Sequence, residues 1–291
     1  VGDDHVFLSV ESRATDKETL PWQRPNVKQI YVLHNPHLSA PFTVPSRIRP
    51  IYRPLLEARN KVAATVFLTE AQRADAEIFF GETPSWKVIP HAAREIVDHN
   101  VKREPKLAVM LARLDQQKQL DHGIKAFKHV LARVPDARLE IWGQGTDRAK
   151  LQDLINSLGL EKSVKLMGYT KSPDLVYQRA SVTLLTSRYE GFGLVVQESL
   201  LNGCPVVSYD LNYGPSDIIV DGVNGFLVPV GSIRALASKA ADVLENKELA
   251  ARLSGGAEDV RKTFSRETIL ARWSALFNEL DAQGWGDEPK E

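Results

Sequence analysis

One continuous segment settles the architecture: Ser187-Arg188-Tyr189-Glu190-Gly191-Phe192-Gly193-Leu194-Val195-Val196-Gln197-Glu198, followed by Ser199-Leu200-Leu201-Asn202-Gly203-Cys204-Pro205-Val206-Val207. The apolar run 182–185 before it predicts a buried strand, and 193–201 predicts a helix that Gly203 ends. The apolar residues 205–208 predict a second buried strand. Strand, turn, helix and strand form one βαβ unit, and parallel sheets built from such units bind ligands beyond the carboxyl ends of their strands.

The turn of this unit combines glycines with two carboxylates. Gly191 and Gly193 let the backbone approach a ligand, and the free N–H groups of the first helical turn favour an anion. Glu190 precedes the turn and Glu198 lies on the helix. Because a carboxylate beside an anion is unfavourable, both are expected to accept hydrogen bonds from hydroxyl groups, as in the recognition of a sugar nucleotide. The alternative is that both are ordinary surface acids.

From Glu190 to Glu198 the sequence resembles the E-x7-E signature of the retaining glycosyltransferases of family 4, which have the GT-B architecture. The resemblance implies that Glu190 contacts the donor sugar and that Glu198 holds the ribose. It is strongest for residues 105–282, and within the family it points to bacterial enzymes that α-glycosylate wall teichoic acid or surface proteins. The other donor contacts expected in this segment are Ser187, Gly191, Phe192, Gly193 and Leu194.

Two cations follow the first predicted strand of the second domain, 107–111. Arg113 and Lys118 lie in the loop at the carboxyl end of that strand, where doubly wound sheets bind phosphate. The resemblance implies that they hold the donor diphosphate opposite the Glu190 turn. The competing interpretation is a pair of solvated loop charges.

Two more strand ends are expected to border the nucleotide. Gly143 and Gly145 follow the strand 138–142, but Arg148 stands where a dinucleotide fingerprint needs its third glycine. The resemblance assigns these two glycines to close approach of the nucleotide. It assigns Met167 and Tyr169, at the end of the next strand, to reading the base, although Tyr169 could equally be a packed aromatic residue.

Two histidines compete for a role near the reacting groups. His34 ends the strand 29–33 of the first domain and is expected to face the interdomain cleft, where the resemblance implies contact with the donor sugar. A neutral imidazole can serve there because it both donates and accepts hydrogen bonds. His37 is the alternative, and a structural role is open for either.

Residues 46–61 are predicted to form a helix interrupted by prolines. Basic residues alternate with apolar ones along it, so it could dock a polyanionic acceptor or a phospholipid surface. A solvated helix face is the simpler interpretation. The basic residues are Arg47, Arg49, Arg53, Arg59 and Lys61.

The fold class expected is α/β GT-B, with two Rossmann-like domains that face a cleft. We expect a partial first domain at 1–95, a linker at 96–105, the nucleotide-sugar domain at 106–265, a helix at 266–283 that crosses back to the first domain, and a tail at 284–291. The first part has too few βα units for a closed domain. It is therefore either incomplete at its beginning or naturally short.

Composition narrows the class of protein. The 291 residues carry 37 basic and 37 acidic side chains, so no global field favours nucleic acid. The single Cys204 rules out an internal disulfide, and no apolar run is long enough to span a bilayer. A cytoplasmic protein, with or without peripheral contact to the inner face of the membrane, is expected; the oligomeric state is left open.

These features predict a metal-independent retaining hexosyltransferase. It would move glucose or N-acetylglucosamine from a UDP-sugar to a hydroxyl of a cell-envelope polymer, glycolipid or protein. No cofactor or metal is expected, because no Asp-x-Asp motif is present and Arg113, Lys118 and the amides after Glu190 can neutralise the diphosphate. A sugar-nucleotide epimerase of the same fold and a non-catalytic sugar-nucleotide-binding module are the alternatives. A nicotinamide oxidoreductase and a P-loop triphosphatase lack their motifs here.

Overall fold

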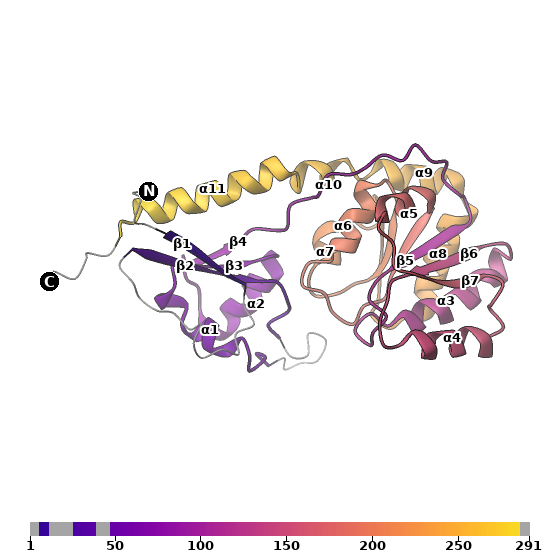
Figure 1. The fold of residues 1–291 in the computed structure, drawn as a ribbon, viewed down its shortest axis with the longest axis horizontal. Coiled ribbons are helices and arrows are strands. Elements are labelled where there is room, and N and C mark those ends of the chain that lie inside the picture. Colours follow the sequence, from indigo (N-terminus) through magenta and orange to yellow (C-terminus); the bar gives the residue numbers. More distant parts are fainter. Residues whose placement is uncertain (1–5, 12–25, 39–46, 286–291) are drawn as a thin grey trace. The chain divides into compact units, whose positions relative to one another are not determined.

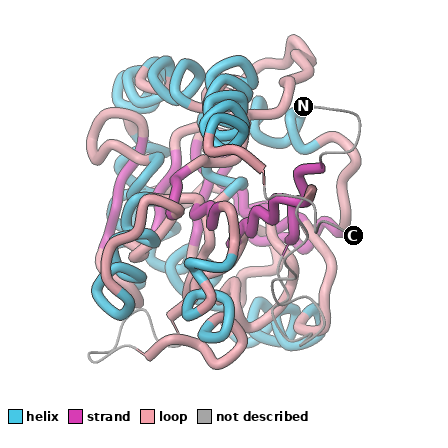
Figure 2. The backbone as a smooth tube through the Cα atoms, turned by 90° about the vertical axis from the view of Figure 1, so that its left-hand side faces the viewer, coloured by secondary structure: helices cyan, strands magenta, loops and turns pink. Residues whose placement is uncertain are grey.

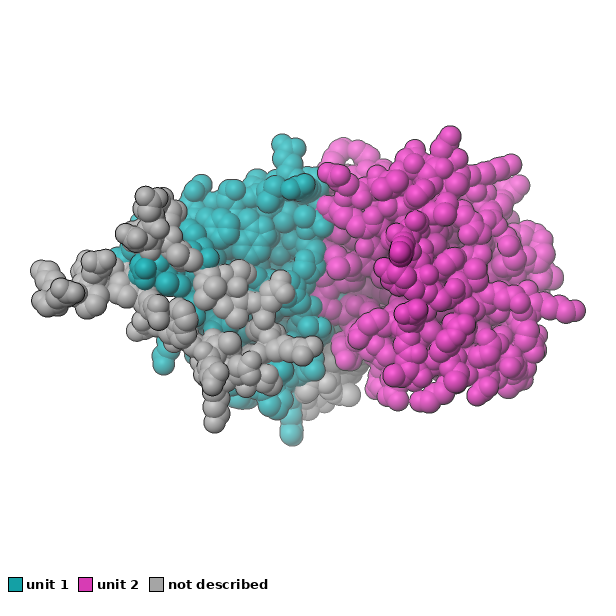
Figure 3. Space-filling model, viewed as in Figure 1, with its two compact units in different colours: residues 1–92, 212–214, 264–291 teal, residues 93–211, 215–263 magenta. Residues whose placement is uncertain are grey.

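The computed structural model describes residues 6–11, 26–38 and 47–285. The chain forms two compact units, coloured separately in Figure 3. Unit 1 comprises Val1–Ala92, Asn212–Gly214 and Phe264–Glu291, and unit 2 comprises Ala93–Leu211 and Pro215–Thr263. The boundary between the units falls after residue 92. Residues 93–105, which include the segment 96–105 expected to be a linker, group with the second unit.

Unit 1 contains a parallel sheet in the order β1-β2-β3-β4 (Figure 1). Its strands are β1 (Val6–Glu11), β2 (Val27–Leu33), β3 (Ala64–Phe67) and β4 (Trp86–Val88). Helix α2 (Glu70–Phe80) joins β3 to β4, and the Thr69 hydroxyl accepts a hydrogen bond from the Gln72 amide at 3.1 Å. Thr69 is therefore the N-cap of α2, because its hydroxyl satisfies one of the free N–H groups at the helix start.

The helix predicted over 46–61, interrupted by prolines, is present only in part. The described part of this segment has one short helix, α1 (Arg53–Glu57), and a 3-10 turn, η2 (Arg59–Lys61), because prolines cannot continue a helix interior. Arg47 and Arg49 lie outside both. Tyr52, Leu55 and Leu56 are buried in the core of unit 1, so they are not available as the apolar half of a docking surface.

The last long helix, α11 (Arg266–Ala282), packs against the strands of unit 1. Its Glu279 carboxylate pairs with Lys87 of β4 at 2.7 Å, and Phe277 contacts Phe7 of β1 with ring centroids 5.0 Å apart. Lys28 of β2 donates to the Leu280 carbonyl. These contacts explain why the C-terminal helix belongs to the first unit.

Unit 2 is built on a six-stranded parallel sheet in the order β10-β9-β8-β5-β6-β7. The strands are β5 (Leu107–Leu111), β6 (Arg138–Trp142), β7 (Val164–Gly168), β8 (Val182–Leu185), β9 (Val206–Tyr209) and β10 (Gly225–Val228). Numbering these strands from one gives the order 3-2-1-4-5-6 of dinucleotide-binding sheets, in which ligands bind where the order reverses. That point lies between β5 and β8.

Helices cover both faces of this sheet (Figure 2). Successive side chains of a strand point to opposite faces, and on β5 Ala108 and Met110 enter one core while Leu107, Val109 and Leu111 enter another. The helices are α3 (Leu120–Arg133), α4 (Arg148–Ser157), α5 (Pro173–Arg179), α6 (Leu194–Leu201), α7 (Pro215–Ile218), α8 (Ile233–Glu245), α9 (Lys247–Gly255) and α10 (Glu258–Thr263).

The strands predicted at 107–111, 138–142, 182–185 and 205–208 are confirmed to within one residue. Near the end of the unit the chain breaks between two successive helices, α9 and α10. Gly256 lies at the break. A Cβ there would stand 2.2 Å from the Val223 carbonyl oxygen, so the backbone passes too close to another loop for any other residue.

Candidate active site

The loops that follow β5 and β8 lie side by side at the carboxyl edge of the sheet. They are joined by hydrogen bonds from the Arg188 amide to the Gln117 carbonyl at 2.8 Å and from the Gln117 side-chain amide to the Tyr189 carbonyl at 3.1 Å. The Thr186 hydroxyl donates to the Lys118 carbonyl at 2.8 Å. Because β5 and β8 are neighbours at the switch point, the cationic loop and the Glu190 turn form one continuous surface.

Lys118 and Glu190 form an ion pair on this surface. The Lys118 Nζ atom lies 2.7 Å from Glu190 Oε1, and the two side chains are only 14% and 11% exposed. The Ser187 hydroxyl donates to the same carboxylate oxygen at 2.6 Å. Two of the predicted catalytic residues are thus brought together, and Ser187 fixes the orientation of the carboxylate.

Arg113, the second predicted cation, does not contact Glu190. Its side chain is 70% exposed, lies 3.3 Å from the Asp115 carboxylate and donates to the Gln117 side chain at 3.1 Å. It is therefore held in the same loop as Lys118 by exposed contacts that a ligand anion could replace at little cost.

Helix α6 begins at the turn after Glu190. Gly193 caps it in the left-handed conformation with φ +88°, which few other residues adopt without strain. Gly191 is not among the glycines with positive φ. Phe192 is buried and anchors the turn, whereas Leu194 is 46% exposed at the helix start. The N–H groups of Leu194 and its neighbour have no acceptor inside the helix, which makes this end suited to an anion.

Glu198 is held by residues that sequence reasoning did not identify. The Arg94 guanidinium donates to its carboxylate at 3.2 Å, and the buried Tyr177 hydroxyl donates at 3.4 Å. The Arg94 guanidinium also donates two hydrogen bonds, of 2.6 and 2.8 Å, to the Asp174 carboxylate. The Asn202 side chain bridges Asp174 and the Glu198 carbonyl at 2.9 Å each.

The charges of this network are mutually stabilised. The hydrogen bond with Asp174 raises the pKa of Arg94 above its usual value, although burial opposes it. Burial would raise the pKa of Asp174, but hydrogen bonds from Arg94, Asn202 and the Val97 amide outweigh it and lower the pKa. Burial raises the pKa of Tyr177, which keeps it a neutral donor to Glu198. Glu198 therefore lies half-buried beside a permanent cation.

A pocket of about 310 Å³ opens at the ends of β5, β6 and β7. Arg113, Trp142, Gly143 and Tyr169 line it. Tyr169 is 67% exposed, which excludes a purely packed aromatic. Met167 is 41% exposed but does not line the pocket. Aromatic walls beside a cation at this edge suit a nucleobase attached to phosphate.

Packing of the fold requires glycine at positions 143 and 145, whether or not a ligand binds beside them. A Cβ at Gly143 would lie 1.8 Å from the Ala112 carbonyl oxygen, and one at Gly145 would lie 2.3 Å from the Leu114 carbonyl oxygen. The Leu114 amide also donates to the Gln144 carbonyl at 2.9 Å. The two glycines allow the loops after β5 and β6 to pack backbone to backbone.

The two histidines have different environments in unit 1. The His34 Nδ1 atom lies 3.3 Å from His91 Nε2, and the two rings stack with centroids 5.1 Å apart. His37 is fully buried between Phe67 and Tyr213, and burial lowers its pKa to about 4. Since a buried neutral ring cannot reach a ligand, His34 is the one of the two that could.

The described residues contain no group of three or more His, Cys, Asp or Glu side chains placed to hold a metal ion. Within residues 6–11, 26–38 and 47–285, no helix has both the length and the apolar character needed to cross a bilayer.

Comparison with known families identifies unit 2. Residues 92–260 match the family model described as glycosyl transferases group 1. The chain belongs to this family. The matched residues contain both loops of the candidate site, the Glu198 network and the pocket at the ends of β5, β6 and β7.

Curated relatives are longer than this chain. It is 32% identical to the poly(glycerol-phosphate) alpha-glucosyltransferase of Bacillus subtilis over 94% of its own length and 41% of that protein. It is 31% identical to the poly(ribitol-phosphate) alpha-N-acetylglucosaminyltransferase of Staphylococcus aureus, over 77% of its length and 45% of that protein. The chain thus spans less than half of the length of these two relatives.

The fold is shared with solved glycosyltransferase structures. A TarM variant of S. aureus, crystallised with fondaparinux, alpha-GlcNAc-glycerol and UDP, superimposes with a TM-score of 0.81 at 29% identity. The match covers 87% of this chain and 51% of that one. The predicted α/β class with parallel sheets of the GT-B kind is confirmed.

Proposed function

We propose that the protein is a metal-independent, retaining glycosyltransferase of family 4. It would move glucose or N-acetylglucosamine from a UDP-sugar to a hydroxyl of a cell-envelope polymer, glycolipid or protein, in the cytoplasm or at the inner face of the membrane. The observation that carries the proposal is the Lys118–Glu190 ion pair, 2.7 Å across, beside the free amides of α6 at the switch point of the sheet.

The Lys118–Glu190 pair is suited to a ligand in which a negatively charged group lies next to a group that carries hydroxyls. In the structure the Lys118 ammonium is neutralised by Glu190. A diphosphate at the start of α6 would draw the ammonium to itself, which frees the carboxylate to accept a hydrogen bond from the sugar. Ser187 already orients that carboxylate, so little reorganisation is needed.

The remaining residues fit the rest of a UDP-sugar. Arg113 can add charge to the diphosphate, and the pocket beside Trp142 and Tyr169 has the aromatic character expected of a base site. Glu198 is proposed to accept the ribose hydroxyls while Arg94 and Tyr177 hold it in place. His34 is proposed to contact the sugar or the reacting region.

The proposed reaction is a front-face substitution. The bond between the anomeric carbon and the diphosphate oxygen breaks, and a bond between that carbon and the acceptor oxygen forms. The acceptor proton passes to the departing phosphate oxygen, so UDP and the glycosylated acceptor are the products. The protein contributes positioning and fixed positive charge rather than a covalent intermediate.

The test uses the full-length protein with UDP-glucose and UDP-N-acetylglucosamine and with phosphate-polymer, glycolipid and protein acceptors. UDP release and acceptor mass are followed together. Lys118→Ala and Glu190→Ala are each expected to slow transfer by about a hundredfold or more, the usual loss when one preorganised electrostatic contact is removed. The matched control is Lys125→Ala, which removes an exposed ion pair with Asp121 on α3.

Three outcomes contradict parts of the proposal. Normal turnover in either site variant would remove that residue from the reaction. Conversion of the sugar nucleotide without a change in acceptor mass would favour the epimerase. Binding of UDP without either product would favour a non-catalytic module.

A further inference from the structure

A second pocket lies at the opposite edge of the sheet in unit 2. Its volume is about 480 Å³, within the range of small-molecule sites. Pro105, Ser181 and Gly203 line it, and they precede β5, β8 and β9 respectively. Because all six strands are parallel, this is the amino edge, whereas the candidate active site occupies the carboxyl edge.

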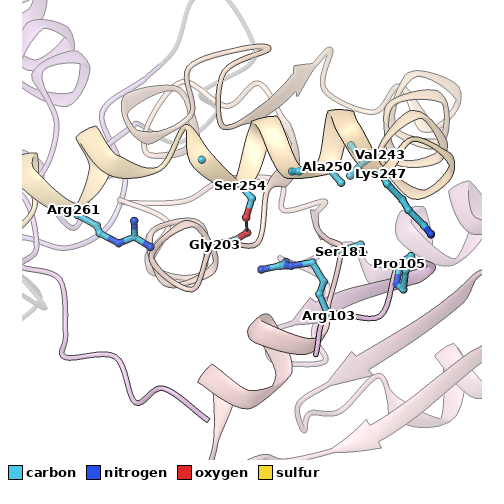
Figure 4. Close-up of a pocket in the computed structure, with 11 residues that line it drawn as sticks. Arg103, Pro105, Ser181, Gly203, Val243, Lys247, Ala250, Ser254 and Arg261 are labelled. Carbon is cyan, nitrogen blue, oxygen red and sulfur yellow. Dashed lines mark hydrogen bonds between the residues drawn. The ribbon is translucent and has the colours of Figure 1, made fainter. Parts of the chain in front are cut away.

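The charged side chains that line this pocket are all cationic. They are Arg103, Lys247 and Arg261 (Figure 4), and no aspartate or glutamate is among the lining residues. Basic and acidic residues are equal in number over the whole chain, so this is a local excess of positive charge. One carboxylate outside the lining, Glu258, lies 3.4 Å from Arg261 and is exposed.

The arginines retain both charge and donor capacity. Arg103 donates to the carbonyls of Ala180 and Asn202, and Arg261 donates to the Leu201 carbonyl at 3.0 Å. These carbonyl acceptors are neutral, and the one anionic partner, Glu258, contacts Arg261 only through an exposed pair at 3.4 Å. Because a guanidinium has five N–H donors, charge and donors remain for an anion. In Figure 4 the two guanidinium groups flank the hydrogen bond from Ser254 to the Gly203 carbonyl.

Stabilisation of helix ends explains why two of the three cations lie at this pocket, but not the third. A cation near the last carbonyls of α5 and α6 is favourable, which accounts for Arg103 and Arg261. Lys247 is different, because it is the first residue of α9, where the helix dipole disfavours a cation. It makes no ion pair with the residues that the structure describes. Lys247 is exposed, so neither an ion pair nor stabilisation of a helix end requires its charge at the pocket.

We propose that this pocket binds the phosphate group of an organic phosphate, separately from the donor site. The two arginines would contact the phosphate, Lys247 would add positive charge at the Pro105 end of the pocket, and Val243, Ala250 and Pro105 would contact the carbon skeleton. Two sources share this chemistry: a free phosphorylated metabolite and a phosphodiester of a polymeric acceptor. Only the second source rests on the proposed function.

The test is calorimetric titration of the full-length protein with two probes, sn-glycerol 3-phosphate and a short glycerol-phosphate oligomer, both in saturating UDP. Lys247→Glu is expected to weaken probe binding by about tenfold or more. Lys128→Glu, the same charge change on an exposed lysine of α3, is expected to alter it less than about twofold. Ala251→Phe, at an exposed position on the pocket wall, should block binding by bulk without removing charge.

The probes identify the source of the phosphate. Tighter binding of the oligomer supports a polymer, and equal or tighter binding of glycerol 3-phosphate supports a metabolite. The inference is overturned if neither probe binds up to about 10 mM, if Lys247→Glu and Ala251→Phe bind like the wild type, or if the probes bind only when UDP is left out. Failure of UDP to bind the wild type contradicts the proposed function instead, and probe titration without UDP then decides the present inference.

Discussion

Replacing Arg94 with methionine should destabilise unit 2, because it leaves the buried Asp174 carboxylate without its cation. The Asp174 side chain is 5% exposed and the Arg94 side chain 36% exposed. Breaking a fully buried pair costs about 3–5 kcal/mol and an exposed one less than about 1 kcal/mol, so this half-exposed pair should cost about 2 kcal/mol. With a urea m-value of about 2 kcal/mol/M, the unfolding midpoint should fall by about 1 M at pH 7.

The loss should depend on pH in a definite direction. The pKa of Asp174 is lowered in the folded protein, so its contribution to stability is complete above the ordinary value of 3.8 and is lost as pH falls through the folded pKa. In the variant, burial without the guanidinium raises that pKa, so the carboxyl protonates sooner. The difference between the two proteins should therefore shrink as pH falls from 7 towards 4.

Urea titrations monitored by circular dichroism at several pH values measure both effects. Arg94→Lys should lie between wild type and Arg94→Met, since an ammonium keeps the charge but cannot bind Asp174 through two parallel donors. Lys125→Met, which removes an exposed ion pair with Asp121, should change the midpoint by no more than about 0.2 M. An unchanged midpoint in Arg94→Met, or the same shift at every pH, would refute the electrostatic reasoning.

Three other variants test separate parts of the structure. His37 should contribute a loss of about 3 kcal/mol to wild-type stability between pH 7 and 4, because it binds a proton only near pH 4 when folded, and His37→Phe should lack that contribution in urea titrations. Gly143→Ala should lower the urea midpoint, since its Cβ would lie 1.8 Å from the Ala112 carbonyl oxygen, whereas Gly255→Ala meets no atom within 4 Å and should not. Tyr169→Ala should weaken UDP binding about tenfold by calorimetry while circular dichroism stays unchanged. These expectations would be contradicted, respectively, by a wild-type pH profile in His37→Phe, by a wild-type urea midpoint in Gly143→Ala, and by wild-type UDP affinity in Tyr169→Ala.

The sheet of unit 2 was predictable because its strands are buried on both faces. Such strands are short apolar runs bounded by turn residues, as at 107–111 and 182–185, and helices such as α3 and α8 are amphipathic. The approach of Lys118 to Glu190 follows from the same pattern, since both lie after strands that meet at the switch point. The helix predicted over 46–61 is reduced to 53–57, because the prolines that were expected to interrupt it leave only a short helix.

The Arg94 network could not be predicted in the same way. Arg94 lies in a polar segment without periodicity, and its partners Asp174 and Glu198 are 80 and 104 residues away in the chain. No local pattern marks a contact of that span. The roles of Gly143 and Gly145 were likewise hidden, because close packing of two loop backbones depends on strand order rather than on the residues around each glycine.

The three residues 212–214 belong to unit 1 although the chain on both sides of them belongs to unit 2. Tyr213 is buried there, stacks on His37 and donates its hydroxyl to Asp75. A fragment that begins at residue 93 would therefore contain the Tyr213 ring without the unit 1 core that buries it. The complementary fragment that ends at residue 92 would lack the ring that stacks on His37. Separate preparation of the two units therefore requires the segment 212–214 to be shortened or replaced, because a single cut in the chain does not separate them.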